Sequence, residues 1–181
     1  MFARTPRLTL RPGWIEDAPA LAAAIAHEAV VTRLAHVPWP YTTDDAESFL
    51  TMPLGRGEAA CLVFAHEGGA ATLVGGVGVH GSAPNFELGY WFTPDAWGRG
   101  YATEAGRAML GIARHALGHR RLGSGHELDN PASGRVLRKL GFTATGRTEQ
   151  RACRAQGRDV ATATYQLALD ADECDPPRMA A

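Results

Sequence analysis

Alternating apolar and polar positions divide the chain into short strands and amphipathic helices. Residues 7–11 alternate as a strand, and six more strands are expected at 60–66, 72–80, 86–92, 121–127, 142–152 and 159–168. Helical spacing predicts further elements over 16–26, 27–35 and 44–51, the last with Thr43 as its N-cap. The pattern predicts an α+β layout in which strands and helices alternate.

The most regular helical pattern follows the strand at 86–92. Apolar residues recur at 101, 102, 105, 108, 109, 112, 113 and 116, and Gly118 is the expected stop. Polar positions such as Glu104 are expected on the opposite face. Gly98 and Gly100 precede this helix, and both can adopt φ > 0 and let a ligand approach the backbone closely. A strand, a glycine turn and a helix N-terminus together suit a phosphate, although a plain connecting turn would have the same pattern.

Two common phosphate loops do not fit this turn. A P-loop ends in Gly-Lys-Ser/Thr, whereas the chain has Gly100-Tyr101-Ala102. A dinucleotide fingerprint needs a third glycine three residues after the second, and here the next glycine is Gly106. The expected ligand is therefore a phosphorylated cofactor that is bound in another way.

A second helix N-terminus is predicted at Asn130-Pro131, where asparagine is a natural N-cap and proline a natural first residue. Gly141 can end this helix after Leu140. Capping alone would account for Asn130.

Together these segments resemble the GNAT acetyltransferase superfamily. The window Trp97-Gly98-Arg99-Gly100-Tyr101-Ala102 is similar to its motif A, with Trp97 in place of the usual Gln or Arg. Three further stretches resemble the RimJ/RimL-like branch in the same order: 5–12, 38–46, and motif B at 130–133 with 139–142. The resemblance covers roughly 4–169. It implies an α/β three-layer fold, with a mixed, mostly antiparallel sheet of about seven strands and about four helices.

The resemblance also implies that acetyl-CoA is the donor and that an amine accepts the acetyl group. It carries donor-binding roles to Tyr90, Trp91, Phe92, Gly98, Arg99, Gly100, Tyr101, Ala102, Thr103, Asn130, Ser133 and Lys139. At 90–92 the contact is expected from the backbone of a strand bulge, which would also stabilise the oxyanion. Arg99 is expected at the pyrophosphate, and Arg138 or Lys139 at the 3′-phosphate.

Catalytic roles are less directly transferred. Many relatives have a tyrosine seven residues after the motif-B asparagine, where this chain has Leu137. The resemblance therefore gives the thiolate contact to Ser133, although a first-turn serine without a chemical role is the alternative. Glu87 is the candidate general base and Glu149 a second one, against the alternative that each is a surface carboxylate on a strand.

Composition narrows the possibilities further. A chain of 181 residues is expected to form one domain over 1–169, followed by a flexible tail at 170–181. The net charge of −1 gives no support to nucleic-acid or membrane binding. The three cysteines and seven histidines lack the spacing of a metal site or a disulfide framework. Without a visible signal peptide, a cytoplasmic location is expected.

The sequence thus favours an N-acetyltransferase in which the amine attacks directly in a ternary complex, since neither Cys61 nor Cys153 has an activating base. Its acceptor is a peptide or ribosomal-protein N-terminus or a small amine, and a homodimer is expected by analogy. The alternatives are a CoA-binding sensor without catalysis and an enzyme for an unrelated nucleotide.

Overall fold

A single eight-stranded sheet runs through the part of the chain that the structure, a computed structural model, describes: residues 1–67 and 69–169. Its spatial order is β1-β2-β3-β4-β5-β6-β8-β7, and every neighbouring pair is antiparallel except β5 and β6. The strands are β1 (Ala3–Arg4), β2 (Leu8–Arg11), β3 (Ala59–Ala65), β4 (Thr72–Ser82), β5 (Asn85–Phe92), β6 (Arg121–Glu127), β7 (Thr143–Cys153) and β8 (Arg158–Ala168).

The mixed, mostly antiparallel sheet confirms the predicted fold class, with one strand more than expected. The additional strand β1 has only two residues, which is too short for alternation to reveal, and it pairs Ala3 with Leu10 of β2. The other seven strands lie within two residues of their predicted bounds.

Five α-helices are found in the described residues, where about four were expected. They are α1 (Ala18–Ile25), α2 (Glu28–Val31), α3 (Thr43–Thr51), α4 (Tyr101–His115) and α5 (Pro131–Lys139). The helix predicted at 16–26 begins later, because Ile15–Asp17 forms a 3-10 turn. The helix predicted at 27–35 is only one turn long. Gly118, the expected stop of α4, adopts φ +73° shortly after its end.

The predicted cap of α3 is wrong by one residue. Thr42, not Thr43, is the N-cap: its hydroxyl accepts from the Asp45 N–H, and the Asp45 carboxylate accepts from the Thr42 N–H. This reciprocal box needs a carboxylate three residues after the threonine. Thr43 is followed at that distance by Ala46, so it cannot form one.

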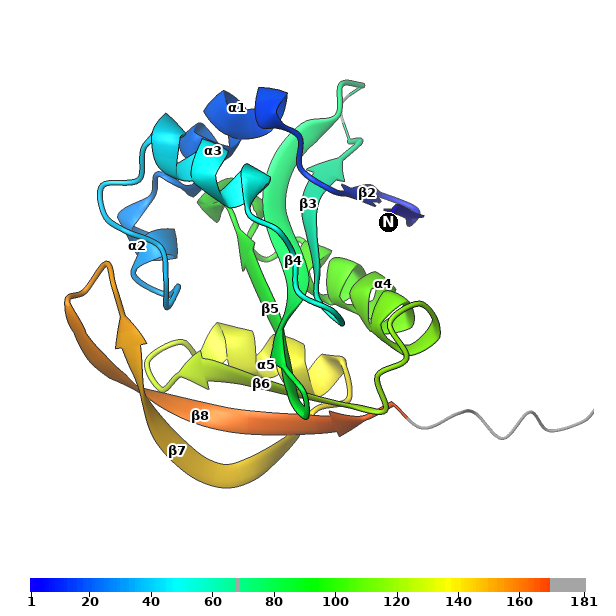
Figure 1. The fold of residues 1–181 in the computed structure, drawn as a ribbon, viewed down its shortest axis with the longest axis vertical. Helices are drawn as coiled ribbons and strands as arrows, with labels where there is room; N and C mark the ends of the chain where they lie inside the picture. The colour runs from blue at the N-terminus through cyan, green and yellow to red at the C-terminus, as the bar shows by residue number, and fades with distance from the viewer. Residues whose placement is uncertain (68, 170–181) are drawn as a thin grey trace, which may run out of the picture.

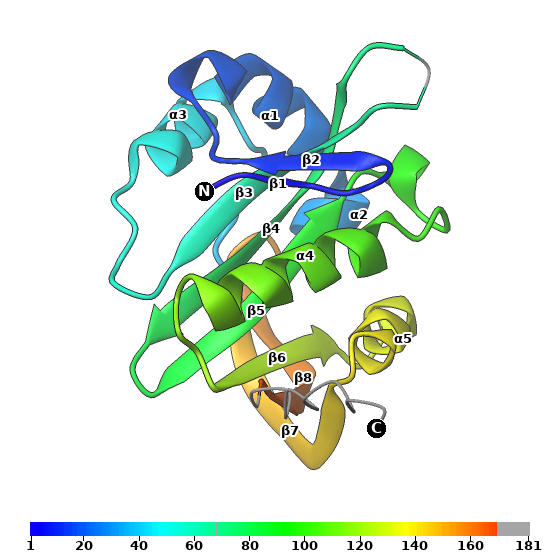
Figure 2. The same ribbon diagram turned by 90° about the vertical axis from the view of Figure 1, so that its right-hand side faces the viewer.

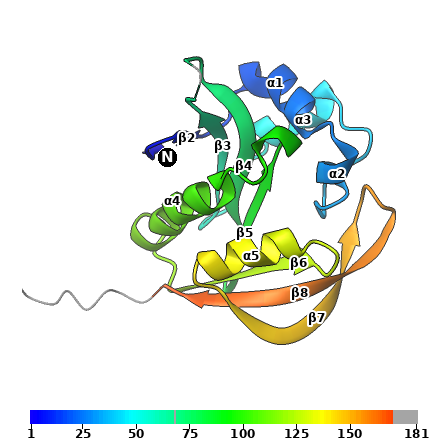
Figure 3. The same cartoon turned by 180° about the vertical axis from the view of Figure 1, so that it is seen from behind.

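The helices cover both faces of the sheet (Figure 1). On one face α1, α2 and α3 pack against the sheet through two smaller apolar clusters. On the other face α4 packs against β2, β4 and β5, and α5 packs beside α4 and β6 (Figure 2). From behind, the tip of the β7–β8 hairpin reaches the segment after α2 (Figure 3), where the Arg154 N–H donates to the Ala35 carbonyl at 2.9 Å.

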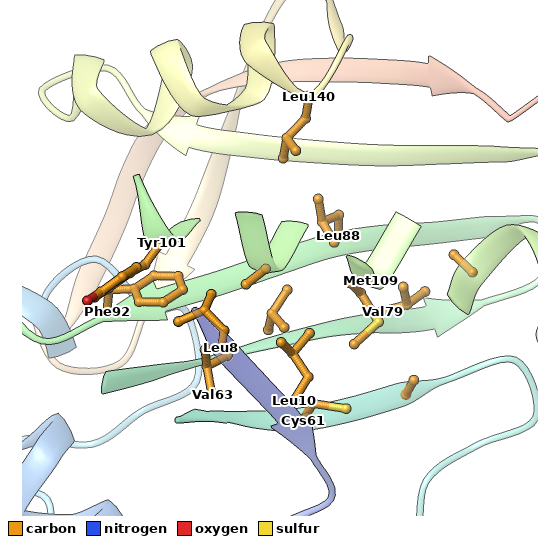
Figure 4. Packing of buried hydrophobic residues seen from close by; sticks show 14 of the residues in the cluster. Leu8, Leu10, Cys61, Val63, Val79, Leu88, Phe92, Tyr101, Met109 and Leu140 are labelled. Carbon is orange, nitrogen blue, oxygen red and sulfur yellow. The ribbon is translucent and has the colours of Figure 1, made fainter. Parts of the chain in front are cut away.

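The main core lies between the sheet and α4 (Figure 4). Tyr101, Ala105, Met109 and Ala113 of α4 are fully buried, as the helical spacing predicts. Along β5 the even-numbered side chains face this core, whereas Trp91 packs against the clusters on the opposite face. The two faces of β5 therefore carry different chemistry.

The single-domain prediction for 1–169 stays a prediction, and the tail at 170–181 lies outside the described residues. Within 1–67 and 69–169, no helix is long and apolar enough to cross a membrane.

Candidate active site

The sheet opens between its two parallel strands. Of β5 and β6, both described in full, only Glu87 and Gly123 are paired in register, and next to them the Ser124 hydroxyl donates to the Leu88 carbonyl at 2.8 Å. Beyond this point the strands part. The carboxyl end of β5 leads into the N-terminus of α4, and that of β6 leads into α5. Two helix N-termini thus flank one gap, an arrangement that favours an anionic ligand.

The turn that is predicted to form a phosphate cradle lies at the N-terminus of α4 and has the expected backbone conformation. Gly98 has φ +76° and Gly100, the N-cap, has φ +82°, a region that other residues rarely adopt. The first intrahelical bond runs from the Glu104 N–H to the Gly100 carbonyl at 3.1 Å. The N–H groups of Tyr101, Ala102 and Thr103 therefore point out of the helix end, where they can donate to phosphate oxygens.

Arg99 lies at the cradle, but its guanidinium already has an anionic partner. It forms a close ion pair with Glu67, whose carboxylate also accepts from the Tyr101 hydroxyl. Hydrogen bonding from Tyr101, together with Arg99 and Arg7, lowers the pKa of Glu67, so this carboxylate is ionised at neutral pH. Arg99 and Glu67 are 47% and 39% exposed, so a ligand phosphate can reach both.

The prediction that Glu104 faces solvent is wrong. Its carboxylate connects α4 to the segment between β1 and β2. Its side chain is only 17% exposed and accepts hydrogen bonds from the Thr5 hydroxyl, the Arg7 N–H and the Arg7 guanidinium. Burial raises the pKa of Glu104, but these hydrogen bonds outweigh it and lower the pKa overall. Arg7 also donates to the Arg99 carbonyl at 2.9 Å, which holds the cradle loop in place.

Trp97, which stands where motif A usually has Gln or Arg, has a structural contact. Its indole N–H donates to the Phe92 carbonyl at 2.8 Å, while about half of the side chain remains exposed. The loop is thereby tied to the end of β5, and the backbone of Gly98 and Gly100 is left open.

The predicted strand bulge around 90–92 is wrong. All eight β4–β5 pairs, from Gly75–Phe92 to Ser82–Asn85, follow one unbroken register. The open backbone arises from the parting of β5 and β6 instead. Thr93 donates to β4 through its N–H, whereas the Leu88 carbonyl faces β6, so by alternation the Tyr90 N–H also faces the gap.

Asn130 caps α5 as predicted: its Oδ1 accepts from the Ser133 N–H at 3.3 Å, and Gly141 ends the helix with φ +92°. Ser133 is half-buried in the first turn. Its Oγ lies 2.7 Å from the Tyr90 hydroxyl, which also reaches the Ser133 carbonyl at 3.1 Å. Sequence reasoning missed this pairing, because the two residues are 43 positions apart.

Three other residues of α5 bear on the predicted site, and they lie in the core or in the last turn of the helix. Leu137, at the position where relatives have tyrosine, is fully buried and lies in the core. Arg138 and Lys139 lie in the last turn, at the opposite end of the helix from Ser133, and Arg138 reaches the Tyr165 hydroxyl at 3.4 Å. Their contact with a 3′-phosphate stays a prediction.

Glu87 lies on the face of β5 opposite to Tyr90. Both of its carboxylate oxygens accept from Arg151, at 2.7 and 2.8 Å, and Arg151 also donates to Glu149 at 3.0 Å. The structure therefore joins both predicted candidate bases through one guanidinium. Glu87 is about a third exposed and Glu149 about half exposed, so water reaches each of them.

His80 is a titratable group beside Glu87 that no sequence pattern singles out. It is paired with Glu87 across the β4–β5 ladder, and its ring lies over Gly89, where an added Cβ would meet Cε1 at 2.9 Å. Desolvation lowers the pKa of His80 against the opposing pull of Glu87 and Glu58. The imidazole is therefore neutral at pH 7 and can accept a hydrogen bond.

The remaining aromatic residues on this face are mainly structural. Tyr41 packs against Trp91 and the α1–α3 clusters, and burial raises its pKa to about 12. Trp39 is 44% exposed and remains available to a ligand. An open hollow lies nearby, lined by residues of the segment after α2 and of the β7–β8 hairpin, among them His36, Cys153 and Arg154.

Cys61 and Cys153 are both buried. The Cys153 thiol lies 3.4 Å from the Thr32 carbonyl, and burial raises the pKa of Cys61, which keeps its thiol protonated. Neither sulfur is poised as a nucleophile. In the described part of the chain, no group of three His, Cys, Asp or Glu side chains could hold a metal.

The part of the chain that contains the cradle, the gap and the second helix N-terminus matches one family model. Residues 7–143 match the model of the acetyltransferase (GNAT) domain. The chain belongs to the GNAT acetyltransferase family. The match spans β2 to the start of β7 and includes the cradle, Tyr90 and Ser133.

Known proteins agree with this assignment. The uncharacterized N-acetyltransferase YoaA of Bacillus subtilis is 36% identical over 77 residues, which is 41% of this chain and 44% of that protein; the match thus spans less than half of this relative. A GNAT-family acetyltransferase from Bacillus anthracis superposes with TM-score 0.78 over 93% of this chain and 99% of the other, at 22% identity. RimL, the ribosomal L7/L12 α-N-protein acetyltransferase solved with coenzyme A, gives TM-score 0.77 over 95% and 100%, at 20% identity.

Proposed function

We propose that this GNAT acetyltransferase transfers an acetyl group from acetyl-CoA to a primary amine by direct attack in a ternary complex. The observation that carries the proposal is the gap between β5 and β6, which has the α4 cradle at one side and the Ser133 hydroxyl at the other. RimL, whose fold this chain shares, was solved with coenzyme A, which supports the choice of donor and the RimJ/RimL-like branch.

The donor is held mainly by backbone. The N–H groups of the first α4 turn bind the pyrophosphate, with Arg99 adding charge once it leaves Glu67. The backbone of Tyr90, Trp91 and Phe92 runs beside the extended arm of the donor, and the Tyr90 N–H is placed to stabilise the oxyanion. Asn130 and Ser133 line the opposite side of the gap, and Lys139 is assigned to the 3′-phosphate.

The chemistry needs a neutral amine and a stabilised leaving thiolate. Acetyl-CoA supplies the thioester, whose carbonyl carbon the amine attacks. Ser133 is the proposed hydrogen-bond donor to the thiolate. On the opposite face Glu87, with Glu149 as the second candidate, is the proposed base and receives the amine proton through water. Each carboxylate oxygen of Glu87 still has a lone pair beyond the one that Arg151 occupies.

The acceptor is proposed to be an α-amine. An α-amino group titrates near 7.7–8.0, so roughly a quarter is neutral at cytosolic pH, against about one part in a thousand for a lysine side chain. Glu87 and Glu149 are both already paired with Arg151. Such a site suits an acceptor that depends less on a general base. A peptide or ribosomal-protein N-terminus, as RimL modifies, is favoured over a small amine.

An acceptor screen tests the proposal. Purified protein is incubated with acetyl-CoA and a panel of N-terminal peptides, lysine side-chain analogues and small amines, and thiol release is followed. We expect turnover with at least one α-amine peptide. The second candidate is a catalytically silent CoA-binding sensor, which predicts that CoA raises the melting temperature while no amine releases thiol. An enzyme for an unrelated nucleotide predicts no thermal shift with CoA.

The same proposal places the protein in the reducing cytoplasm, where the free thiols of Cys61 and Cys153 are stable. A homodimer is proposed from the branch resemblance and is tested by light scattering on the purified protein.

A further inference from the structure

The hydroxyl that many GNAT enzymes place on the motif-B helix is missing at Leu137, yet a phenol reaches the same helix from the neighbouring strand. Tyr90 projects from the core-facing side of β5, and its hydroxyl lies 2.7 Å from Ser133 Oγ. This pairing has no role in the function proposed so far, in which only the backbone of Tyr90 is used.

The number of available protons decides what the pair can do. The Tyr90 hydroxyl has one proton and two acceptors on Ser133: Oγ at 2.7 Å and the carbonyl at 3.1 Å. If the proton goes to Oγ, the Ser133 proton is free to point at a third group. If it goes to the carbonyl, the Ser133 hydroxyl donates its own hydrogen bond to the Tyr90 oxygen and none remains for a third group. The 2.7 Å separation of the two hydroxyls fits either direction. The first arrangement is favoured because a phenol is a stronger hydrogen-bond donor than an aliphatic hydroxyl, and because the Ser133 carbonyl already accepts the helical N–H four residues on.

We propose that Tyr90 is the positioning residue for Ser133: by donating to Oγ, it directs the Ser133 proton into the β5–β6 gap, toward the sulfur of CoA. This inference rests on the proposed function, because it assumes that the sulfur lies in that gap. It assigns the Tyr90 side chain a role separate from the donor contact of its backbone.

The surroundings of Tyr90 suit a fixed donor. Its ring packs against the main core, and burial raises its pKa to about 12, with Tyr165 adding to the shift and Ser133 opposing it. The phenol therefore stays protonated throughout the pH range of the reaction. The Ser133 backbone is fixed from the other side by Asn130. The ring of His126 lies against Gly134, the residue after Ser133, and its Nδ1 is 2.7 Å from the Glu127 carbonyl.

Neither hydroxyl transfers its proton. A thiolate, with a parent pKa near 8.5, is too weak a base to take a proton from a phenol of pKa about 12. The C–N bond forms and the C–S bond breaks; the amine releases its proton to the base, and the thiolate is later protonated by water. Tyr90 and Ser133 lower the barrier by donating hydrogen bonds to the developing charge, and a chain of two such bonds strengthens the outer one.

The thiol pKa of bound CoA tests this without any acceptor. Complexes of the full chain with CoA are titrated by the ultraviolet absorbance of the thiolate, with the CoA-free protein subtracted. We expect a pKa below that of free CoA in the wild type, and a rise of about half a unit or more in Ser133→Ala and in Tyr90→Phe. Tyr41→Phe is the matched control, because it also removes a buried phenol whose pKa is raised to about 12 but which packs on the opposite face of the sheet, and it should leave the value unchanged. Replacing Tyr90 with 3-fluorotyrosine, a stronger donor, should lower the pKa further, which structural damage cannot mimic.

Kinetics give the second readout. Tyr90→Phe should lower kcat about tenfold with little change in KM for acetyl-CoA, and the Tyr90→Phe/Ser133→Ala double variant should be no slower than Ser133→Ala alone. A bound-thiol pKa that is the same in the wild type, Tyr90→Phe and the fluorotyrosine protein overturns the inference. So does additivity in the double variant. Failure of CoA to bind overturns this inference and the proposed function together, whereas a Tyr90-dependent thiol pKa without transfer to any amine overturns the proposed function alone.

Discussion

Arg151 and Glu87 form a bidentate ion pair: Nη1 donates to one carboxylate oxygen at 2.7 Å and Nη2 to the other at 2.8 Å. The two residues are 64 positions apart, on β5 and β7, which are not neighbours in the sheet. The same guanidinium reaches Glu149. The proposed base is thus an orientated carboxylate whose position is fixed by a cationic partner.

Glu87→Gln tests the base role. If Glu87 receives the amine proton, the variant should lose most activity at low pH, where a larger share of the acceptor amine carries the extra proton. The measurement is kcat/KM for the acceptor from about pH 6 to pH 9. Glu149→Gln, which removes the other carboxylate on the same arginine, tests the second candidate base in the same pH series. A pH–rate profile that Glu87→Gln leaves unchanged would remove Glu87 from the mechanism.

Glu67→Gln should tighten CoA binding. The Glu67 carboxylate occupies Arg99 and adds a negative charge beside the cradle, so neutralising it should lower the dissociation constant several-fold. The gain should shrink as salt is added, because both side chains are partly exposed. Titration calorimetry with CoA at two salt concentrations measures it. Glu58→Gln, which removes a carboxylate bonded to the N–H groups of Gly55 and Gly81, should leave CoA affinity as it was.

Gly100→Ala should separate cradle geometry from ordinary backbone strain. Gly100 has φ +82° and Gly118 has φ +73°, so alanine costs about 1–2 kcal/mol of stability at either site. Only Gly100 lies where a ligand phosphate would approach the backbone. Gly100→Ala should therefore lose at least tenfold in CoA affinity, whereas Gly118→Ala should lose stability alone. Equal CoA affinity in the two variants would contradict the assignment of the cradle.

Asp17→Asn should destabilise the N-terminal region. Asp17 accepts from both terminal nitrogens of Arg11 at 2.7 Å and from the Trp14 N–H at 2.8 Å, and the two charged side chains are only about 15% exposed. We expect a loss of about 2 kcal/mol at pH 7 in urea unfolding.

The pH dependence of this loss has a definite sign. Hydrogen bonding from Arg11 lowers the pKa of Asp17 in the folded state. The stabilisation is therefore complete above the unfolded carboxyl pKa of about 3.9 and disappears as the pH falls through the lower, folded value. The stability difference between wild type and Asp17→Asn should stay constant from about pH 6 to 8 and shrink below about pH 4. A difference that grows on acidification would contradict the pairing.

The sequence predicts features that depend on neighbours in the chain. Alternation located seven strands, and the cap at Asn130 and the glycines at 98 and 100 follow from residue types at fixed spacing. The two-residue β1 carries too few positions for a period, and the capping error at Thr43 arose because two threonines compete for one helix start.

The side-chain partnerships could not be predicted in this way. Glu67 and Arg99 are 32 positions apart, Tyr90 and Ser133 are 43, and Glu87 and Arg151 are 64. Each pair depends on how strands and helices are stacked, which composition and periodicity do not encode. The sequence therefore predicted the glycine turn and the two helix N-termini, and it left the partners of Ser133 and Glu87 unidentified.

The alternation of side chains along β5 determines what an insertion in this strand would do. Tyr90 and Glu87 lie on opposite sides of one strand because their positions differ by an odd number. One residue inserted between them would put both on the same side, so that either Ser133 or Arg151 would lose its partner. Length changes in this strand, even ones made of harmless residues, are thus more damaging than most substitutions, and homologues with active sites of this kind should conserve its length more strictly than its composition.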